Sequence, residues 1–175
     1  MRRQMPPAKL SKNTFCSFCA TRFPEGAPWP RNCAACQNTS YVNPVPVAVL
    51  VVPIGDGVLT VRRGIEPHIG KLALPGGYIN LGESWQRAAT REVEEETGLV
   101  VDTAGVRDFR VLSAPDGTVL VFGTAGALPA NALDVAAFEP SHETSELVIV
   151  RAAQELAFPL HTQVLAEWFA RKPAT

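Results

Sequence analysis

The stretch PGGYINLGESWQRAATREVEEETGL, residues 75–99, decides how the rest of the chain is interpreted. Ser84 suits the N-cap position of a helix, because its hydroxyl can accept a hydrogen bond from a free backbone N–H of the first turn. Gly98 suits the position just after a helix, where the backbone turns into the left-handed conformation. These two signals predict a helix of three turns over residues 85–96.

Three glutamates of this helix, Glu92, Glu95 and Glu96, stand at i, i+3 and i+4 and therefore share one face. The position is unfavourable, because each carboxylate opposes the negative end of the helix dipole at a cost of about 0.3–1 kcal/mol. Arg91 is the nearby basic residue that can offset this charge. A solvated acidic face is one reading, since such faces are common. The other is a site for Mg²⁺ or Mn²⁺, which prefer carboxylate oxygens.

The four cysteines of the chain form two C-x2-C pairs, CSFC at Cys16 and Cys19 and CAAC at Cys33 and Cys36. Two such pairs can present four thiolates to Zn²⁺ in a tetrahedral site. Disulfides or free thiols are the alternatives. The intervening segment is rich in Pro and Gly, so a metal rather than an apolar core is expected to hold it together. We therefore predict a small zinc ribbon over residues 13–42 in which the zinc is structural.

The composition favours an ordinary globular chain. The 175 residues are 46% hydrophobic and carry a net charge of -1, which gives no overall electrostatic signature of a nucleic-acid-binding protein. The first residues are basic, and residues 1–12 are predicted to be a flexible tail. The longest apolar run is only long enough for a strand, and the N-terminus lacks the apolar region of a secretory signal. We expect a cytoplasmic protein with no membrane partner.

The remaining pattern predicts alternating strands and loops followed by a helix. Residues 47–63 are interpreted as two strands that turn at Asp56 and Gly57, a favourable hairpin dipeptide. Further strands are predicted over residues 72–74, 106–112, 118–124 and 147–150, and residues 125–146 are predicted to be mainly a loop. Residues 159–172 place five apolar side chains on one helical stripe, which indicates core packing. These side chains are Leu160, Val164, Leu165, Trp168 and Phe169.

The spacing of the polar residues around the helix resembles the signature of the Nudix hydrolase family, G-x5-E-x7-R-E-U-x-E-E-x-G-U, where U is apolar. Gly77, Glu83 and the segment REVEEETGL at residues 91–99 match every fixed position. The resemblance implies an α/β fold, an α/β/α sandwich around a mixed sheet, over residues 43–175. It also implies hydrolysis of a nucleoside diphosphate linked to another moiety.

The resemblance also implies roles for individual residues. Glu92, Glu95 and Glu96 would bind Mg²⁺ or Mn²⁺ together with the carbonyl of Gly76. Arg91 and Glu83 would orient these ligands without touching the metal. The group that takes a proton from the attacking water would be one of the three ligand glutamates or a glutamate of the long loop. Among the loop residues we favour Glu143 and Glu146 over Glu139, and the alternative is that they are ordinary exposed charges.

The substrate is less constrained by the sequence. A zinc ribbon before a Nudix domain resembles the NADH pyrophosphatase branch, but the aromatic residues of that branch's downstream motif are missing from LSAPDGTVL at residues 112–120. The segment RRGIEPHIGKLALPGGYINLGES is closer to Nudix proteins related to FAD and ADP-ribose pyrophosphatases. In this interpretation Arg62 and Arg63 contact phosphate, and Gly76 and Gly77 line the substrate site. Ordinary surface charge is the alternative for both arginines.

Several other aromatic and histidine side chains are expected to have structural roles. Tyr78, Phe122 and Phe158 could stack on a base, but core packing is the favoured interpretation of each. The three histidines, His68, His142 and His161, are expected to lie in loops or on a helix surface.

Two other functions stay open at this stage. One is hydrolysis of a nucleoside triphosphate or of NAD-capped RNA. The other is a non-catalytic module that binds a nucleotide, with nucleic acid as an alternative partner of the ribbon. A homodimer follows only from the family resemblance.

Overall fold

The computed structural model describes residues 12–171, and their contacts divide the chain into two units, Met1–Pro44 and Val45–Thr175. The flexible tail expected over residues 1–12 lies almost wholly outside the described residues. The domain limits at residues 13–42 and 43–175 remain predictions. Within residues 12–171, the two helices are too short and insufficiently apolar to cross a lipid bilayer.

The smaller unit is built around its cysteines. Strands β1 (Arg31–Asn32) and β2 (Thr39–Ser40) pair in antiparallel fashion. Cys16 and Cys33 are buried together with Phe23, and Cys36 packs against them. The described part of this unit therefore has a very small apolar core, in which two of the three buried members are cysteines.

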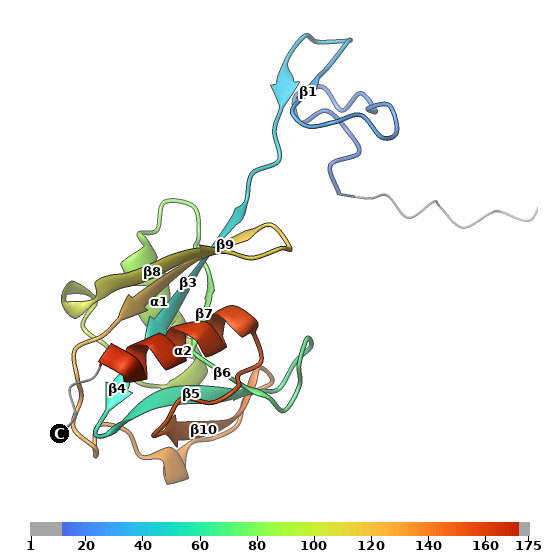
Figure 1. Ribbon diagram of the computed structural model, residues 1–175. Coiled ribbons are helices and arrows are strands. Elements are labelled where there is room, and N and C mark those ends of the chain that lie inside the picture. Colours follow the sequence, from blue (N-terminus) through green and yellow to red (C-terminus); the bar gives the residue numbers. More distant parts are fainter. Residues whose placement is uncertain (1–11, 172–175) are drawn as a thin grey trace, which may run out of the picture. The chain divides into compact units, whose positions relative to one another are not determined.

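The larger unit contains two four-stranded sheets (Figure 1). The first has the order β7 (Gly76–Tyr78), β3 (Val45–Val51), β9 (Thr118–Thr124) and β8 (Arg107–Ser113). In the second, β5 (Gly57–Arg63) lies between β10 (Thr144–Val150) and β4 (Pro53–Ile54), and also pairs with β6 (Leu72–Ala73). The pair β3–β9 is parallel and all the others are antiparallel, so the first sheet is mixed.

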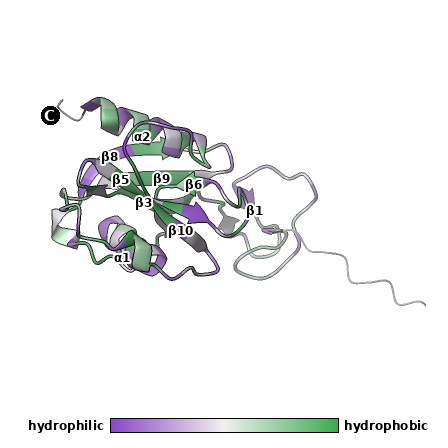
Figure 2. Cartoon of the chain, turned by 90° about the horizontal axis from the view of Figure 1, so that it is seen from below, coloured by the Kyte–Doolittle hydropathy of each residue, from purple (hydrophilic) through white to green (hydrophobic). Residues whose placement is uncertain are grey.

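Alternate side chains of β3 face opposite sides of the sheet, as the pleat of a strand requires. Ala48 and Leu50 belong to the apolar cluster that contains Ala88 and Val93 of helix α1 (Trp85–Thr97). Val49 and Val51 belong to a second cluster, which contains buried Val164 and Leu165 of helix α2 (Pro159–Arg171). The two helices cover opposite faces of the strands (Figure 2). The predicted α/β/α sandwich around a mixed sheet is confirmed.

The ends of helix α1 form as the sequence predicts. The hydroxyl of Ser84 accepts a hydrogen bond from the backbone N–H of Arg87 at 3.3 Å. Gly98 has φ 73°, and its N–H donates to the carbonyl of Glu94 at 2.8 Å. The helix extends one residue beyond the predicted end, to Thr97. The predicted apolar stripe of α2 is also confirmed, because all five of its residues pack in one core cluster.

Several strand limits differ from the prediction. The hairpin between β4 and β5 turns at Gly55 and Asp56, one residue earlier than expected, because Gly55 adopts φ 57° and Gly57 already pairs with Ile54. Strand β10 begins at residue 144 rather than 147. Strand β7 was not predicted, because its two glycines have low strand propensity and only pairing with β3 makes it a strand. The 3-10 turns η1 (Thr103–Gly105) and η2 (Val135–Ala137) were also missed.

Two side chains lie where the sequence did not place them. His161, expected on a surface, is buried, and its Nδ1 accepts a hydrogen bond from the backbone N–H of Leu74 at 3.2 Å. Burial lowers the pKa of His161 to about 3. Tyr78, expected in the core, is 64% exposed because β7 ends there at the edge of its sheet. Phe122 is fully buried, as predicted.

Candidate active site

Arg91 forms hydrogen bonds with the acidic side chains that surround it on helix α1 and on the loop before the helix. Its Nε and Nη2 atoms each donate to the carboxylate of Glu83 at 3.1 Å, and Nη2 also donates to the carbonyl of Tyr78 at 3.0 Å. Its Nη1 atom donates to Glu92 at 2.7 Å and to Glu95 at 3.0 Å. The hydrogen bond from Arg91 lowers the pKa of Glu83, so this carboxylate is held in its charged form. One guanidinium therefore orients three carboxylates at once, those of Glu83, Glu92 and Glu95.

Two glycines of β7 lie against the carboxylates of Glu92 and Glu96. A Cβ atom on Gly77 would lie 2.5 Å from the Glu92 carboxylate, so a larger residue there would displace this carboxylate from its position. The backbone N–H of Gly76 donates to Oε2 of Glu96 at 3.1 Å. Burial raises the pKa of Glu92, and it raises the pKa of Glu96 to about 8. Both carboxylates are thus held between the helix and β7 in surroundings that disfavour their negative charge.

A cavity of about 320 Å³ lies beside these side chains. Six residues from two segments line it: Glu92, Glu95, Glu96, Ser141, His142 and Glu143. Glu143 was one of the two loop glutamates favoured from the sequence. Ser141 and His142 were not assigned to the site, and the signal for Ser141 would have been its position in a turn that leads into a strand.

The turn that carries Glu143 is held by four hydrogen bonds, two to a side-chain hydroxyl and two between backbone groups. The Ser141 hydroxyl accepts from the N–H of Glu143 at 3.2 Å and from the N–H of Thr144 at 3.0 Å. Ser141 N–H donates to the Thr144 carbonyl at 2.8 Å, and Gly64 N–H donates to the Glu143 carbonyl at 2.7 Å. The Glu143 carboxylate itself makes no hydrogen bond or ion pair with another residue in the range 12–171. These hydrogen bonds fix the backbone of Glu143, and its carboxylate remains available to bind a ligand or accept a proton.

Glu146 and the two arginines proposed for phosphate binding lie outside the lining of this cavity. Arg62 donates to Glu146 at 2.5 Å and to the carbonyl of Gly70 at 2.9 Å. Arg63 donates to the carbonyl of Pro67 at 2.7 Å, and its guanidinium lies 5.0 Å from the centre of the Phe158 ring. Both arginines thus bind the loop that follows β5. Their contact with substrate stays a prediction, as does the metal-binding role of the Gly76 carbonyl.

The four cysteines of the smaller unit form a site that suits Zn²⁺. Their sulfur atoms all lie within 4.8 Å of one another, with 3.7 Å between Cys16 and Cys36 and 3.6 Å between Cys19 and Cys33. A tetrahedral Zn²⁺ with Zn–S bonds of about 2.3 Å requires sulfur atoms about 3.8 Å apart. All four thiols are free of disulfides. The backbone N–H of Phe18 lowers the pKa of Cys16 to about 6, whereas burial and the thiols of Cys19 and Cys33 raise the pKa of Cys36 to about 11.

Residues 44–170 match the family model described as NUDIX domain. The chain is similar to the ADP-ribose pyrophosphatase of Methanocaldococcus jannaschii, with 33% identity over 76 residues that cover 43% of this chain and 44% of that protein. It is also similar to the NAD-capped RNA hydrolase NudC of Edwardsiella ictaluri, with 29% identity over 93 residues that cover 53% of this chain and 36% of that protein. The matches thus span less than half the length of these two relatives.

A solved structure shows the same fold along most of the chain. It is the NUDIX hydrolase from Nitrosomonas europaea, which superposes with a TM-score of 0.65 at 24% sequence identity. The match covers 91% of this chain and 92% of that one. At this identity the likeness bears on the fold alone.

Proposed function

The chain belongs to the NUDIX domain family, and on this basis we propose that it is a divalent-metal-dependent pyrophosphohydrolase. The proposed substrate is a nucleoside diphosphate linked to another moiety, of the FAD, ADP-ribose or NADH type, and the products are AMP and a second phosphorylated compound. One observation carries the proposal: Glu92, Glu95, Glu96 and Glu143 line a single cavity of about 320 Å³.

The carboxylates of this cavity suit Mg²⁺ or Mn²⁺. They supply hard oxygen ligands, and burial together with the nearby charges of Glu92 and Glu143 disfavours ionised Glu96 unless a cation balances it. Glu92, Glu95 and Glu96 would hold the metal, and the bound metal would neutralise charge on the diphosphate oxygens. Arg91 keeps Glu92 and Glu95 directed by hydrogen bonds of 2.7 and 3.0 Å.

Glu143 is the residue we assign as the proton acceptor. Its carboxylate lies at the cavity and has no partner of its own among residues 12–171, whereas Glu146 is paired with Arg62. In the proposed step, a water molecule adds its oxygen to one phosphorus and gives a proton to Glu143. The bond from that phosphorus to the bridging oxygen breaks, and each product leaves with a terminal phosphate.

The zinc ribbon is proposed to have a structural role. The described residues of the smaller unit bury few apolar side chains, so Zn²⁺ at Cys16, Cys19, Cys33 and Cys36 would supply much of its stability. This proposal requires no zinc in the hydrolysis itself.

The test is a substrate panel analysed by chromatography in the presence of Mg²⁺ and of Mn²⁺. FAD, NAD⁺, NADH, ADP-ribose, Ap4A and nucleoside triphosphates are incubated with the wild-type chain and with Glu96→Gln. Release of AMP by the wild type and its loss in Glu96→Gln are expected. Glu155→Gln is the matched control, because Glu155 is exposed and lies outside the cavity lining. Full activity of Glu96→Gln would contradict the metal-ligand assignment.

Hydrolysis of NAD-capped RNA is the second candidate. The similarity to the NAD-capped RNA hydrolase NudC of Edwardsiella ictaluri supports it, over 53% of this chain. A large preference for NAD-capped RNA over free NAD⁺ in kcat/KM would favour this function over hydrolysis of a free dinucleotide.

A further inference from the structure

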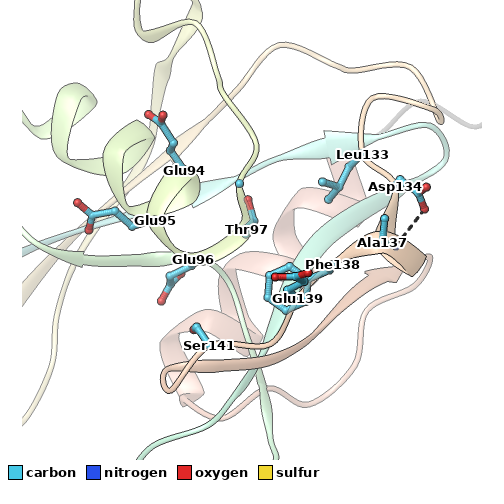
Figure 3. Close-up of a pocket in the computed structure, with 11 residues that line it drawn as sticks. Glu94, Glu95, Glu96, Thr97, Leu133, Asp134, Ala137, Phe138, Glu139 and Ser141 are labelled. Carbon is cyan, nitrogen blue, oxygen red and sulfur yellow. Dashed lines mark hydrogen bonds between the residues drawn. The ribbon is translucent and has the colours of Figure 1, made fainter.

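A second cavity of about 400 Å³ adjoins the proposed reaction site. It shares Glu95, Glu96 and Ser141 with the first cavity, so the two are neighbouring parts of one binding region. Its volume falls within the range of roughly 300–1,000 Å³ that is usual for small-molecule sites. Figure 3 shows residues of its two sides, the C-terminal turn of α1 and the loop that precedes β10.

The loop side of this cavity offers an anchored apolar wall. Leu133 and Phe138 line the cavity, and both also pack against the core cluster under α1. Between them, the Asp134 carboxylate accepts hydrogen bonds from the N–H groups of Ala136 at 3.1 Å and Ala137 at 3.3 Å. Core packing fixes Leu133 and Phe138, and the hydrogen bonds to Asp134 fix the backbone between them. The wall therefore offers a rigid apolar surface that suits a flat ring.

The charge of the lining disfavours direct contact of an anionic group such as phosphate with the loop side of this second cavity. Its lining residues include no Lys, Arg or His, and they include the C-terminal end of α1, where the helix dipole is negative. Glu139 follows Phe138 in the chain and also lines the cavity, whereas Glu94 and Glu95 are directed away from the loop (Figure 3). A neutral or positively charged group is therefore favoured over an anionic one, and a cation is favoured most.

Building on the proposed function, we infer that the second cavity receives the ring of the nucleotide half beyond the diphosphate. It favours a positively charged ring, such as the pyridinium of NAD⁺, over an uncharged one. Phe138 is the specificity-determining residue, because an aromatic face attracts a cation and provides a flat apolar contact. Glu139 adds negative charge to the same lining. The adjoining Glu92, Glu95, Glu96 and Glu143 remain with the diphosphate.

NAD⁺ and NADH provide a matched pair of ligands, because they differ in one hydride and hence in the charge of the nicotinamide ring. Their dissociation constants are measured by equilibrium dialysis in Mg²⁺ with the full chain carrying Glu143→Gln, which removes the proposed proton acceptor and leaves the second cavity intact. We expect NAD⁺ to bind about threefold to tenfold more tightly than NADH, the effect of one partly screened charge. Glu139→Gln should reduce this ratio while leaving the binding of NADH unchanged.

Variants of Phe138 test the ring contact, each introduced into the same Glu143→Gln background. Phe138→Ala should weaken the binding of NAD⁺ at least fivefold, and Phe138→Tyr should restore it, because the aromatic face returns. Val135→Ala is the control, since Val135 lies on the same loop but does not line the cavity. A circular dichroism melt of each variant separates a lost contact from a lost fold.

The outcomes distinguish this inference from the proposed function. Equal affinity for NAD⁺ and NADH, no measurable binding of either, or unchanged binding by Phe138→Ala overturns the ring subsite, even if the wild-type chain releases AMP. Preferential binding of NAD⁺ that depends on Phe138, with no AMP released by the wild type, supports the subsite and contradicts the hydrolysis.

Discussion

The backbone N–H of Gly64 donates a hydrogen bond of 2.7 Å to the carbonyl of Glu143, and so joins the end of β5 to the turn that bears the proposed proton acceptor. The approach is so close that a Cβ atom on Gly64 would overlap the carbonyl oxygen of His142. The position of Glu143 at the cavity therefore depends on a residue 79 positions earlier in the chain, and on its lack of a side chain.

We predict that Gly64→Ala lowers kcat by up to about a hundredfold, because the added methyl group pushes the Glu143 turn away from Glu92 and Glu96. KM and Mg²⁺ affinity should change much less, since the three helix glutamates do not depend on this contact. Steady-state kinetics with the best substrate of the panel provide the measurement. Gly126→Ala is the control, because a Cβ atom there has open space around it. Unchanged kcat in Gly64→Ala would contradict the positioning of Glu143 by this contact.

Arg91→Lys should weaken Mg²⁺ binding about tenfold to hundredfold, although Arg91 is not itself a proposed ligand. A lysine cannot reproduce the paired hydrogen bonds to Glu83 while also reaching Glu92 and Glu95. Calorimetric titration with Mg²⁺ measures the change. Arg87→Lys serves as the control on the exposed part of the same helix. If both variants bind Mg²⁺ as the wild type does, the proposed orienting role of Arg91 is wrong.

His161 is expected to make the larger unit sensitive to acid. Its pKa is about 3 in the folded protein, where it is buried and faces the charge of Arg63, compared with about 6.5 when unfolded. As the pH falls below about 6.5, the unfolded state binds this proton first, so stability decreases by up to about 1.4 kcal/mol per pH unit until the pH approaches 3. Protonation of Nδ1 would also remove its bond from Leu74.

Chemical unfolding of the wild type and of His161→Asn between pH 7 and pH 4 isolates this effect, because other titrating groups act on both proteins. The slope of stability against pH should be smaller in His161→Asn. His142→Asn, altered at an exposed loop histidine, should keep the wild-type slope. Equal slopes for wild type and His161→Asn would show that His161 does not bind a proton differentially.

Removal of zinc should unfold the smaller unit. We expect about one Zn²⁺ per chain by elemental analysis, lost in Cys33→Ser because that thiol is buried among the proposed ligands. Limited proteolysis after chelation should then cut within residues 12–44 and spare residues 45–171, which have their own core. Ser17→Ala is the control, since Ser17 lies between two cysteines without offering a ligand. Resistance of the zinc-stripped segment to protease would contradict a structural role.

The spacing of residues along the chain was sufficient to predict the structural features that depend on residues close in sequence. The cap at Ser84, the end at Gly98 and the shared face of Glu92, Glu95 and Glu96 follow from the period of a helix, and the structure has the predicted ends within one residue. The apolar stripe of α2 follows from the same helical period, whereas the sandwich was implied by the family resemblance. The cysteine cluster follows from two short spacings that suit one tetrahedral ion.

The sequence by itself determined the family signature and the two groups of candidate metal ligands, because each depends on short-range periodicity or spacing. The α/β/α sandwich was predicted only through the resemblance that this signature carries. Only the tertiary structure shows that Glu143 lines the cavity of the helix glutamates, whereas Glu146 pairs with Arg62 across strands β5 and β10. The role of Glu143 as proton acceptor is a proposal that rests on this difference. The tertiary structure also decided the burial of His161 and the strand at β7. These features depend on contacts between residues far apart in the chain, and neither local propensity nor a hydrophobic period encodes such contacts.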